Sequence, residues 1–297
     1  MRYFSLLALA LVLFACDKPA DVVECPAAPD LEPDHPVTVE SEWFTVSYIE
    51  PLTYQIRETS STEGNTVYLL IGSERAVLFD AGTGENAPVD GTKIMHLVEQ
   101  LTTRPVTLVL SHFHYDHVQN AEEPAALAFP DLQWLHDGTD SEGNYPLTNQ
   151  ELIVGTTPSS LHVTDWWPVN EDIDLGGRNV QLLHVPGHAP ESVVLADHTN
   201  KQFFMGDFLY NGPLFSFDES EFGSYEASTD ALLAVSDASY ALYGAHGYPP
   251  VNYSKLETMV GLWDCIAAGD CIPTITTYWG QPVKIYEFGG LELVLFL

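Results

Sequence analysis

The chain has 297 residues and carries 42 acidic against 10 basic side chains, which gives a formal net charge of -32 at pH 7. So acidic a surface repels nucleic acid and anionic lipid headgroups, and we expect neither of them as a binding partner. The length and the 45% of hydrophobic residues are enough for one sizeable core, so we expect a single folded domain at 38–297.

The N-terminal segment predicts export. Residues 1–15 are typical of a signal peptide, because Arg2 precedes an apolar run from Phe4 to Ala15 that is too short to span a bilayer permanently. The run ends in Leu-Phe-Ala-Cys and resembles a bacterial lipoprotein signal, in which Cys16 is acylated after cleavage. We therefore expect a periplasmic or cell-surface lipoprotein that touches the membrane only through a lipid anchor at Cys16. An ordinary signal peptide with another cleavage site is the alternative.

The next segment, 16–37, has prolines at 19, 26, 29, 33 and 36 and few large apolar groups. This composition predicts a disordered, acidic spacer.

Apolar runs bounded by turn residues predict the first strands of the domain at 66–71, 75–80, 105–110 and 132–136. Between the second and the third, Asp90 can cap a helix. Its apolar face would consist of Ile94, Leu97, Val98 and Leu101, which recur at helical spacing.

Directly after the strand at 105–110 comes the most informative stretch, Ser111-His112-Phe113-His114-Tyr115-Asp116-His117. A packed core would not need three imidazoles and a carboxylate in one turn, whereas borderline divalent ions such as zinc prefer these ligands. The stretch therefore predicts a metal site at the end of a strand.

Further candidate ligands follow apolar runs of strand type. The predicted strand 180–185 leads to His188, the strand 202–206 leads to Asp207, and the run 241–245 leads to His246. Upstream, the strand 75–80 ends in Asp80. Its carboxylate can fix the tautomer of a ligand imidazole, or it can cap the turn that follows.

The remaining elements complete the domain. A strand is predicted at 192–197, helices at 229–240 and 253–268, and a hairpin of strands 283–288 and 291–296 around Gly289-Gly290. In an oxidising compartment, a disulfide could close the short turn between Cys265 and Cys271. The insertion 137–168, with Tyr145 and the pair Trp166-Trp167, is a candidate lid or pocket wall.

Taken together, Asp80, the His-x-His-x-Asp-His cluster, His188, Asp207 and His246 closely resemble the metallo-β-lactamase superfamily. The resemblance implies an α/β fold, the αββα sandwich of two similar halves. It also implies that one zinc is held by His112, His114 and His188, and a second by Asp116, His117 and His246, with Asp207 bridging them. Iron or manganese are the alternative metals.

No cysteine occupies a ligand position, and the bridging Asp207 instead resembles the glyoxalase II, lactonase and related esterase branches. Two metal ions about 3.5 to 4 Å apart can share a water and lower its pKa towards about 7. We therefore expect a hydrolase in which a metal-bound hydroxide attacks a carbonyl, while Asp116 and its metal receive the leaving group or its proton.

The substrate is expected to be a small neutral ester, lactone or thioester. The segment 208–245 contains no Lys or Arg to clamp an anion, but it is rich in aromatic residues. These rings form pocket walls or pack the core. Asp207-Phe208-Leu209-Tyr210 is similar to the Asp-x-x-Tyr of lactone-opening relatives, which implies that Tyr210 hydrogen-bonds the reacting carbonyl.

Other functions share these residues. A β-lactam hydrolase or a phosphodiesterase would use the same site, and a non-catalytic metal-binding protein would keep the same ligands. A diiron oxygen reductase is disfavoured because its motif resembles His-x-Glu-x-Asp-His, whereas this chain has His114. The serine hydrolase motif Gly-x-Ser-x-Gly is absent from the sequence. The oligomeric state is not predicted.

Overall fold

The computed structural model describes residues 43–50, 52–84 and 94–297. The predicted signal peptide, the spacer, Cys16 and the helix cap at Asp90 lie outside the described residues. Among the helices that are described, none has the length and apolar character needed to cross a membrane.

The first sheet combines an antiparallel N-terminal part with parallel strands. Its order is β1 (Phe44–Glu50), β2 (Thr53–Glu58), β3 (Thr66–Ile71), β4 (Ala76–Phe79), β5 (Val106–Val109), β6 (Leu127–Pro130) and β9 (Asp165–Trp167). From β4 onward the pairs are parallel, so β4 and β5 end at the same edge of the sheet.

The second sheet has the order β10 (Ile173–Asp174), β11 (Asn179–His184), β12 (Val193–Asp197), β13 (Gln202–Gly206) and β15 (Ala241–Gly244). Because β12 is antiparallel to both β11 and β13, and β13 is parallel to β15, the strands β11, β13 and β15 run in one direction. Their carboxyl ends therefore share an edge.

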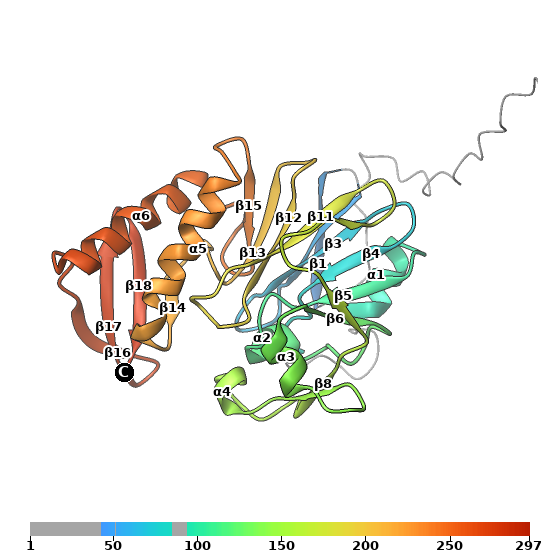
Figure 1. Cartoon of the computed structure of the whole chain (residues 1–297), viewed down its shortest axis with the longest axis horizontal. Helices are drawn as coiled ribbons and strands as arrows, with labels where there is room; N and C mark the ends of the chain where they lie inside the picture. The colour runs from blue at the N-terminus through green and yellow to red at the C-terminus, as the bar shows by residue number, and fades with distance from the viewer. Residues whose placement is uncertain (1–42, 51, 85–93) are drawn as a thin grey trace, which may run out of the picture. The chain divides into compact units, whose positions relative to one another are not determined.

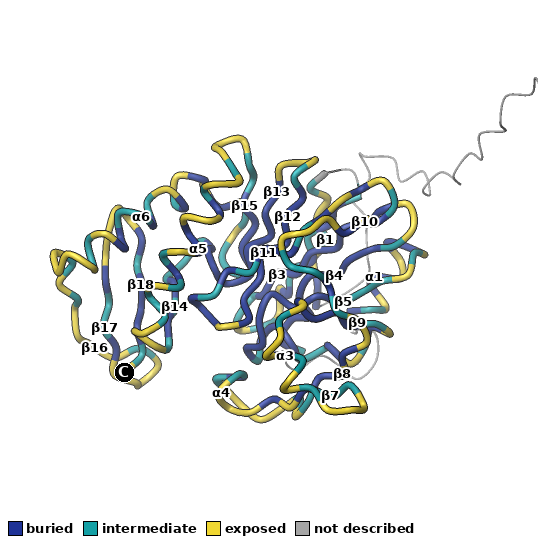
Figure 2. The backbone as a smooth tube through the Cα atoms, in the orientation of Figure 1, coloured by how far each residue is buried: buried dark blue, intermediate teal, exposed yellow. Residues whose placement is uncertain are grey.

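Alternating side chains show that the two sheets pack face to face. Along β3, Tyr68 and Leu70 enter a core shared with Leu195 and Phe204 of the second sheet, while Leu69 enters a separate core on the outer face. Successive residues of a strand point to opposite faces, so a strand buried on both sides must be apolar throughout. All six residues of β3 are buried, as the dark blue strands of Figure 2 show.

Helices cover the outer faces and complete the αββα layers (Figure 1). The predicted face of α1 (Ile94–Leu101) is buried against the first sheet. Two helices, α5 (Phe222–Ala234) and α6 (Tyr253–Ala268), share a core with the outer face of the second sheet. The shorter helices are α2 (Tyr115–Val118), α3 (Gln133–Gly138) and α4 (Asn149–Leu152), with a 3₁₀ turn at Glu219–Glu221.

A third sheet lies beside α5 and α6. Its order is β14 (Leu214–Ser216), β18 (Leu291–Phe296), β17 (Gln281–Phe288) and β16 (Thr274–Tyr278), and a small pair consists of β7 (Asn144–Pro146) and β8 (Ser160–His162). The predicted hairpin around Gly289-Gly290 is confirmed as β17 and β18. The disulfide between Cys265 and Cys271 is also present and closes the C-terminal end of α6.

Two predicted elements were wrong. The run at 132–136 is not a strand: β6 ends at Pro130, and residues from Gln133 form α3, in which only Leu135 is buried. The helix predicted at 229–240 instead spans Phe222–Ala234, because the polar turn around Asp237 ends it before β15. The other predicted strands agree with the structure within two residues at either end. The strands β1, β2, β6, β7, β8, β9, β10, β14 and β16 were not predicted.

Candidate metal centre

The predicted ligands gather because each follows the carboxyl end of a strand at one edge of the sandwich. In the first sheet, β5 leads into the loop that carries His112 and His114, and α2 carries Asp116 and His117. In the second sheet, the loops after β11, β13 and β15 carry the other three ligands. In α/β proteins this strand-end edge is where ligands bind.

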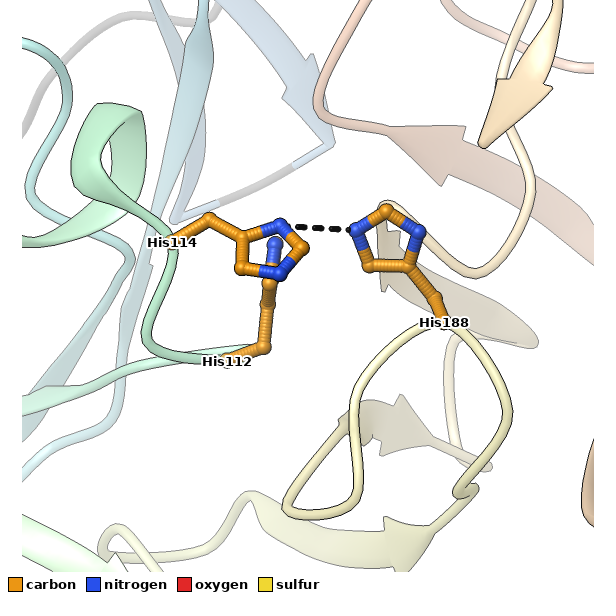
Figure 3. A group of neighbouring side chains, drawn as sticks. All are labelled: His112, His114 and His188. Atoms are coloured by element: carbon orange, nitrogen blue, oxygen red, sulfur yellow. Dashed lines mark hydrogen bonds between the residues drawn. The ribbon is translucent and has the colours of Figure 1, made fainter. Parts of the chain in front are cut away.

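The first group consists of His112, His114 and His188, which are all buried and whose candidate ligand atoms lie within 4.8 Å of one another. Figure 3 shows His188 reaching across from its loop, with its Nε2 3.0 Å from Nδ1 of His114. The ring of His188 is held from behind, since its Nδ1 donates to the carbonyl of Phe215 at 2.8 Å. Its Nε2 is therefore an acceptor whenever the ring is neutral.

Burial keeps these three rings neutral. Because a charged ring loses its hydration inside the protein, burial lowers the pKa of His112 and His114 well below the usual value, and it lowers that of His188 as well. Neutral imidazole is the form that binds metal ions.

The second group consists of Asp116, His117, Asp207 and His246. Nε2 of His246 lies 3.1 Å from Oδ2 of Asp116 and 3.2 Å from Oδ1 of Asp207, and Nε2 of His117 lies 3.5 Å from the same two oxygens. Burial opposes charge on His246, but the carboxylates of Asp207 and Asp116 outweigh it and raise its pKa to about 10. The two carboxylates therefore favour positive charge at this position.

Asp207 faces both groups. Its Oδ1 is directed at His117 and His246, whereas its Oδ2 lies 3.7 Å from Nε2 of His188 in the first group. The preceding residue explains how it comes so close, since a Cβ on Gly206 would stand 2.4 Å from Cβ of Ser111. Only a glycine allows β13 to approach the histidine loop in this way.

Asp80 supports the histidine loop from behind. Its Oδ2 lies 2.9 Å from Nδ1 of His117, and its Oδ1 accepts the backbone N–H of Ser111 at 2.6 Å. Its φ of 71° is unusual for a residue with a side chain, and such strain concentrates at functional sites. The geometry matches the predicted ring-orienting role rather than a capped turn.

An observation that is independent of the sequence motif also indicates that the site fits metal ions. Among the described residues, three buried candidate ligand atoms have no partner in hydrogen-bonding geometry: Nε2 of His112, Nε2 of His117 and Oδ1 of Asp207, the last of which lies 3.2 Å from Nε2 of His246. A buried polar atom without a partner is costly unless something satisfies it, and these three belong to the two ligand groups. Cations bound to the two groups would satisfy all of them.

Both groups open into one cavity of about 510 Å³. The candidate ligands in its lining are His114, Asp116, His188, Asp207 and His246, and no lysine or arginine is among the described residues that line it. The lining residues beyond this set are Glu63, Tyr115, Ile153, Val154, Tyr210, Asn211, Gly212, Pro213, Phe215, Phe217, Gly247, Tyr278 and Trp279.

The predicted pocket residues divide between the wall and the core. Tyr210 lines the cavity and its ring lies 5.2 Å from that of His246, but its hydroxyl donates to the carbonyl of Pro213. Burial raises the pKa of Tyr210 well above its usual value, so the phenol stays protonated. Of the other aromatic residues in the segment 208–245, Phe215 and Phe217 line the cavity, whereas Phe208 and Tyr225 are buried in the core.

The insertion reaches the cavity through residues that sequence reasoning missed. Tyr145 and Trp167 are buried in the cores, and Trp166 stacks on His136, so none of them lines the cavity. The insertion instead contributes Ile153 and Val154. The remaining described histidines, His96, His136, His162, His184 and His198, belong to neither ligand group.

The layered fold and the two ligand groups at its strand ends define an α/β metallohydrolase architecture. Residues 62–246, more than half of the chain, match the family model of the metallo-beta-lactamase superfamily. The chain belongs to this superfamily, as its motifs predicted.

Two curated relatives illustrate its neighbours. The chain is 27% identical over 218 residues to the Gallus gallus protein named acyl-coenzyme A thioesterase MBLAC2. The aligned region covers 66% of this chain and 77% of that protein. It is 26% identical over 172 residues to the Haemophilus influenzae protein named hydroxyacylglutathione hydrolase GloC, which covers 56% of this chain and 80% of the relative.

Solved structures agree on the fold. A metallo-beta-lactamase from Pontibacter korlensis superposes with a TM-score of 0.54 at 17% identity, covering 74% of this chain and 99% of that one. A metallo-beta-lactamase family protein from Thermus thermophilus superposes with a TM-score of 0.54 at 18% identity, and the match covers 76% of this chain and 85% of that one. At these identities the likeness concerns the αββα fold alone.

Proposed function

We propose that the protein is a dinuclear zinc hydrolase that cleaves a neutral ester, lactone or thioester. The observation that carries the proposal is the single cavity into which both ligand groups open. Among the described residues, its lining includes several aromatic and aliphatic side chains and no lysine or arginine.

The ligand sets divide as the motif implies. His112, His114 and His188 would hold one ion and Asp116, His117 and His246 the other, with Asp207 shared between them. Bound ions supply two kinds of chemistry here, activation of a water at neutral pH and polarisation of the substrate carbonyl.

The protein's own groups position the reactants and move the proton. Burial opposes charge on Asp116, but His117 and His246 lower the pKa of its carboxyl, so it is ionised at neutral pH and can accept a proton. Its backbone carbonyl accepts a hydrogen bond from Asn65 Nδ2 at 2.6 Å, which fixes the residue. Asp116 is therefore the proposed proton carrier to the leaving group.

Tyr210 is proposed to hydrogen-bond the reacting carbonyl oxygen. Its hydroxyl is bonded to Pro213 in this structure, so the role requires a rotation of the phenol toward the metal centre. An O–H donor aimed at developing negative charge stabilises the transition state more than the ground state.

The relatives' names support acyl hydrolysis, but the cavity favours a different leaving group. Coenzyme A and glutathione are anionic and call for cationic contacts. Arg57 lies next to the site but is not part of the lining: it donates to the carbonyl of Gly247 and lies 4.4 Å over the ring of Tyr248. The lining instead includes the carboxyl of Glu63. Neutral substrates should therefore be preferred.

A turnover screen tests the proposal. The purified full chain, with its metal content quantified, is assayed on neutral esters and lactones, acyl-coenzyme A, hydroxyacylglutathione, nitrocefin and bis-p-nitrophenyl phosphate. We expect two zinc equivalents and the highest kcat/KM on neutral esters or lactones. Fastest turnover of nitrocefin or of the phosphodiester would replace the substrate assignment, and metal binding without any turnover would favour a non-catalytic protein.

We also propose that the enzyme is exported and held at a membrane by acylation of Cys16. The proposal rests on the signal-like sequence at 1–16 and not on the fold.

A further inference from the structure

We infer that an aromatic ladder on the third sheet binds an apolar alkyl group of the substrate and that Trp279 determines this specificity. The inference rests on the proposed hydrolase function. Two of the three aromatic residues concerned, Trp279 and Phe296, lie beyond position 246, where the family match ends.

The ladder, here defined as Phe217, Phe296 and Trp279, begins at the metal centre. The ring of Phe217 stands edge-on to His114 at 5.2 Å and to His188 at 6.0 Å. It stacks on Phe296 at 5.2 Å with planes 12° apart, and Phe296 stacks on Trp279 at 5.8 Å and 21°. The ladder thus leads from the first histidine group out to an exposed tryptophan.

The backbone holds Trp279 in an unusual place. Tyr278 pairs with Gln281 across the hairpin of β16 and β17, which leaves Trp279 and Gly280 as a two-residue turn with φ of 48° and 77°. Two positive φ values favour Asn, Asp or Gly, and a bulky side chain is strained there. Such strain persists where a function depends on it.

Trp279 is also exposed where folding alone would not require it. It is 68% exposed although it lines the cavity, and Figure 2 shows the strand before it, β16, largely in the colour of exposed residues. Its contacts with Phe215 and Phe296 fix the ring from the protein side. The rest of its apolar surface is available to a ligand.

Other residues that line the cavity are polar, so an alkyl group of the substrate has a preferred place in it. Tyr115 donates to Glu63 at 2.6 Å, and Asn211 donates to the carbonyl of Tyr248 at 2.6 Å. Covering these polar groups with an alkyl chain would remove them from water at a cost in free energy. We therefore expect the alkyl group to lie against the ladder. Ile153 and Val154 line the same cavity and add aliphatic surface.

Two ester series measured by pH-stat test the inference. Methyl alkanoates from acetate to octanoate lengthen the acyl side, and alkyl acetates from methyl to octyl lengthen the alcohol side. Full burial of one methylene group raises the binding affinity about fourfold. A wall that covers the chain on one side only should therefore raise the affinity about twofold per methylene. We expect kcat/KM of the wild type to rise by at least about tenfold along one series, mostly through KM.

Variants assign the effect to the ladder. Trp279→Ala should flatten the rise in kcat/KM with chain length, and Trp279→Phe should largely retain it. Trp134→Ala removes another exposed tryptophan, on α3 and outside the cavity lining, and should behave as the wild type. Unchanged chain-length dependence in Trp279→Ala, or an equal loss on every ester, would overturn the inference.

A binding measurement separates this inference from the proposed function. Calorimetric titration with 1-octanol needs no turnover, and Trp279→Ala should weaken binding by about fivefold or more relative to the wild type and Trp134→Ala. If no ester, lactone or thioester is hydrolysed, the proposed function fails, while the titration still decides whether the ladder binds alkyl groups. Equal octanol affinity in all three proteins would rule the subsite out.

Discussion

Glu191 offers a test of the structure that does not depend on knowing the substrate. Its carboxyl is buried beneath the metal centre, and Oε1 accepts the backbone N–H of Phe113, the residue between two predicted ligands, at 2.8 Å. Burial raises the pKa of Glu191 from its ordinary 4.5 to about 7. Replacement by glutamine keeps an oxygen to accept this bond but removes the titration.

The sign of the effect follows from proton binding. Between pH 4.5 and about 7 the folded state holds a proton that the unfolded state has released, so the free energy of unfolding falls as the pH rises through this window. One pKa unit corresponds to about 1.4 kcal/mol, and between pH 5 and pH 8 the wild type should lose about 2.5 kcal/mol that Glu191→Gln does not lose.

The assay is equilibrium urea unfolding of the wild type and Glu191→Gln at several pH values between 5 and 8, at constant metal concentration. The difference between the two free energies of unfolding should grow steadily in favour of the glutamine variant as the pH rises. Glu171→Gln, which replaces an exposed glutamate, should show no such trend. A wild-type-to-variant difference that is the same at pH 5 and pH 8 would refute the raised pKa of Glu191.

Four further predictions concern the site and the location. His188→Ala should lose one metal equivalent by mass spectrometry and most turnover, whereas His184→Ala, four residues earlier, should keep both; full metal occupancy in His188→Ala would contradict the ligand assignment. Asp80→Asn should weaken metal affinity in chelator competition by about 10- to 100-fold, and wild-type affinity would remove its orienting role. Tyr210→Phe should raise the activation free energy by about 1 to 3 kcal/mol with metal content unchanged, and an unaltered kcat would exclude the phenol from catalysis. Cys16→Ser should release the protein from membrane fractions or block its processing; wild-type protein that is wholly soluble with an unmodified N-terminus would contradict acylation.

The candidate ligands could be located in the sequence because they are histidines and aspartates that come shortly after apolar strands. His188, Asp207 and His246 are far apart along the chain, but the strands before them run in one direction, so their ends meet. The orienting contact of Asp80 was predictable for the same reason, since β4 and β5 are parallel neighbours. The two ligand groups of the structure are those that the motif implied.

The walls of the cavity were harder to predict because they depend on packing between distant segments. Nothing local distinguishes Phe215, which lines the cavity, from Phe208, which is buried in the core. Trp279 lies in a hairpin whose first strand, β16, is mostly exposed and lacks the apolar alternation that marks a strand in sequence. The prediction of a strand at 132–136 was wrong because the apolar residues there form a helical turn. The core residues that this turn packs against are distant in the sequence.

Each ligand group draws on both sheets of the sandwich: the first joins His114 to His188, and the second joins His117 to Asp207 and His246. Neither half can therefore assemble a complete coordination sphere before the other has folded against it. Bound metal would link the two halves and stabilise only the folded state in which they are packed together. This stabilisation grows with the free metal concentration. Chelation should then loosen the two halves together in one cooperative transition, and the protein's resistance to unfolding should follow the metal supply of the compartment in which it resides.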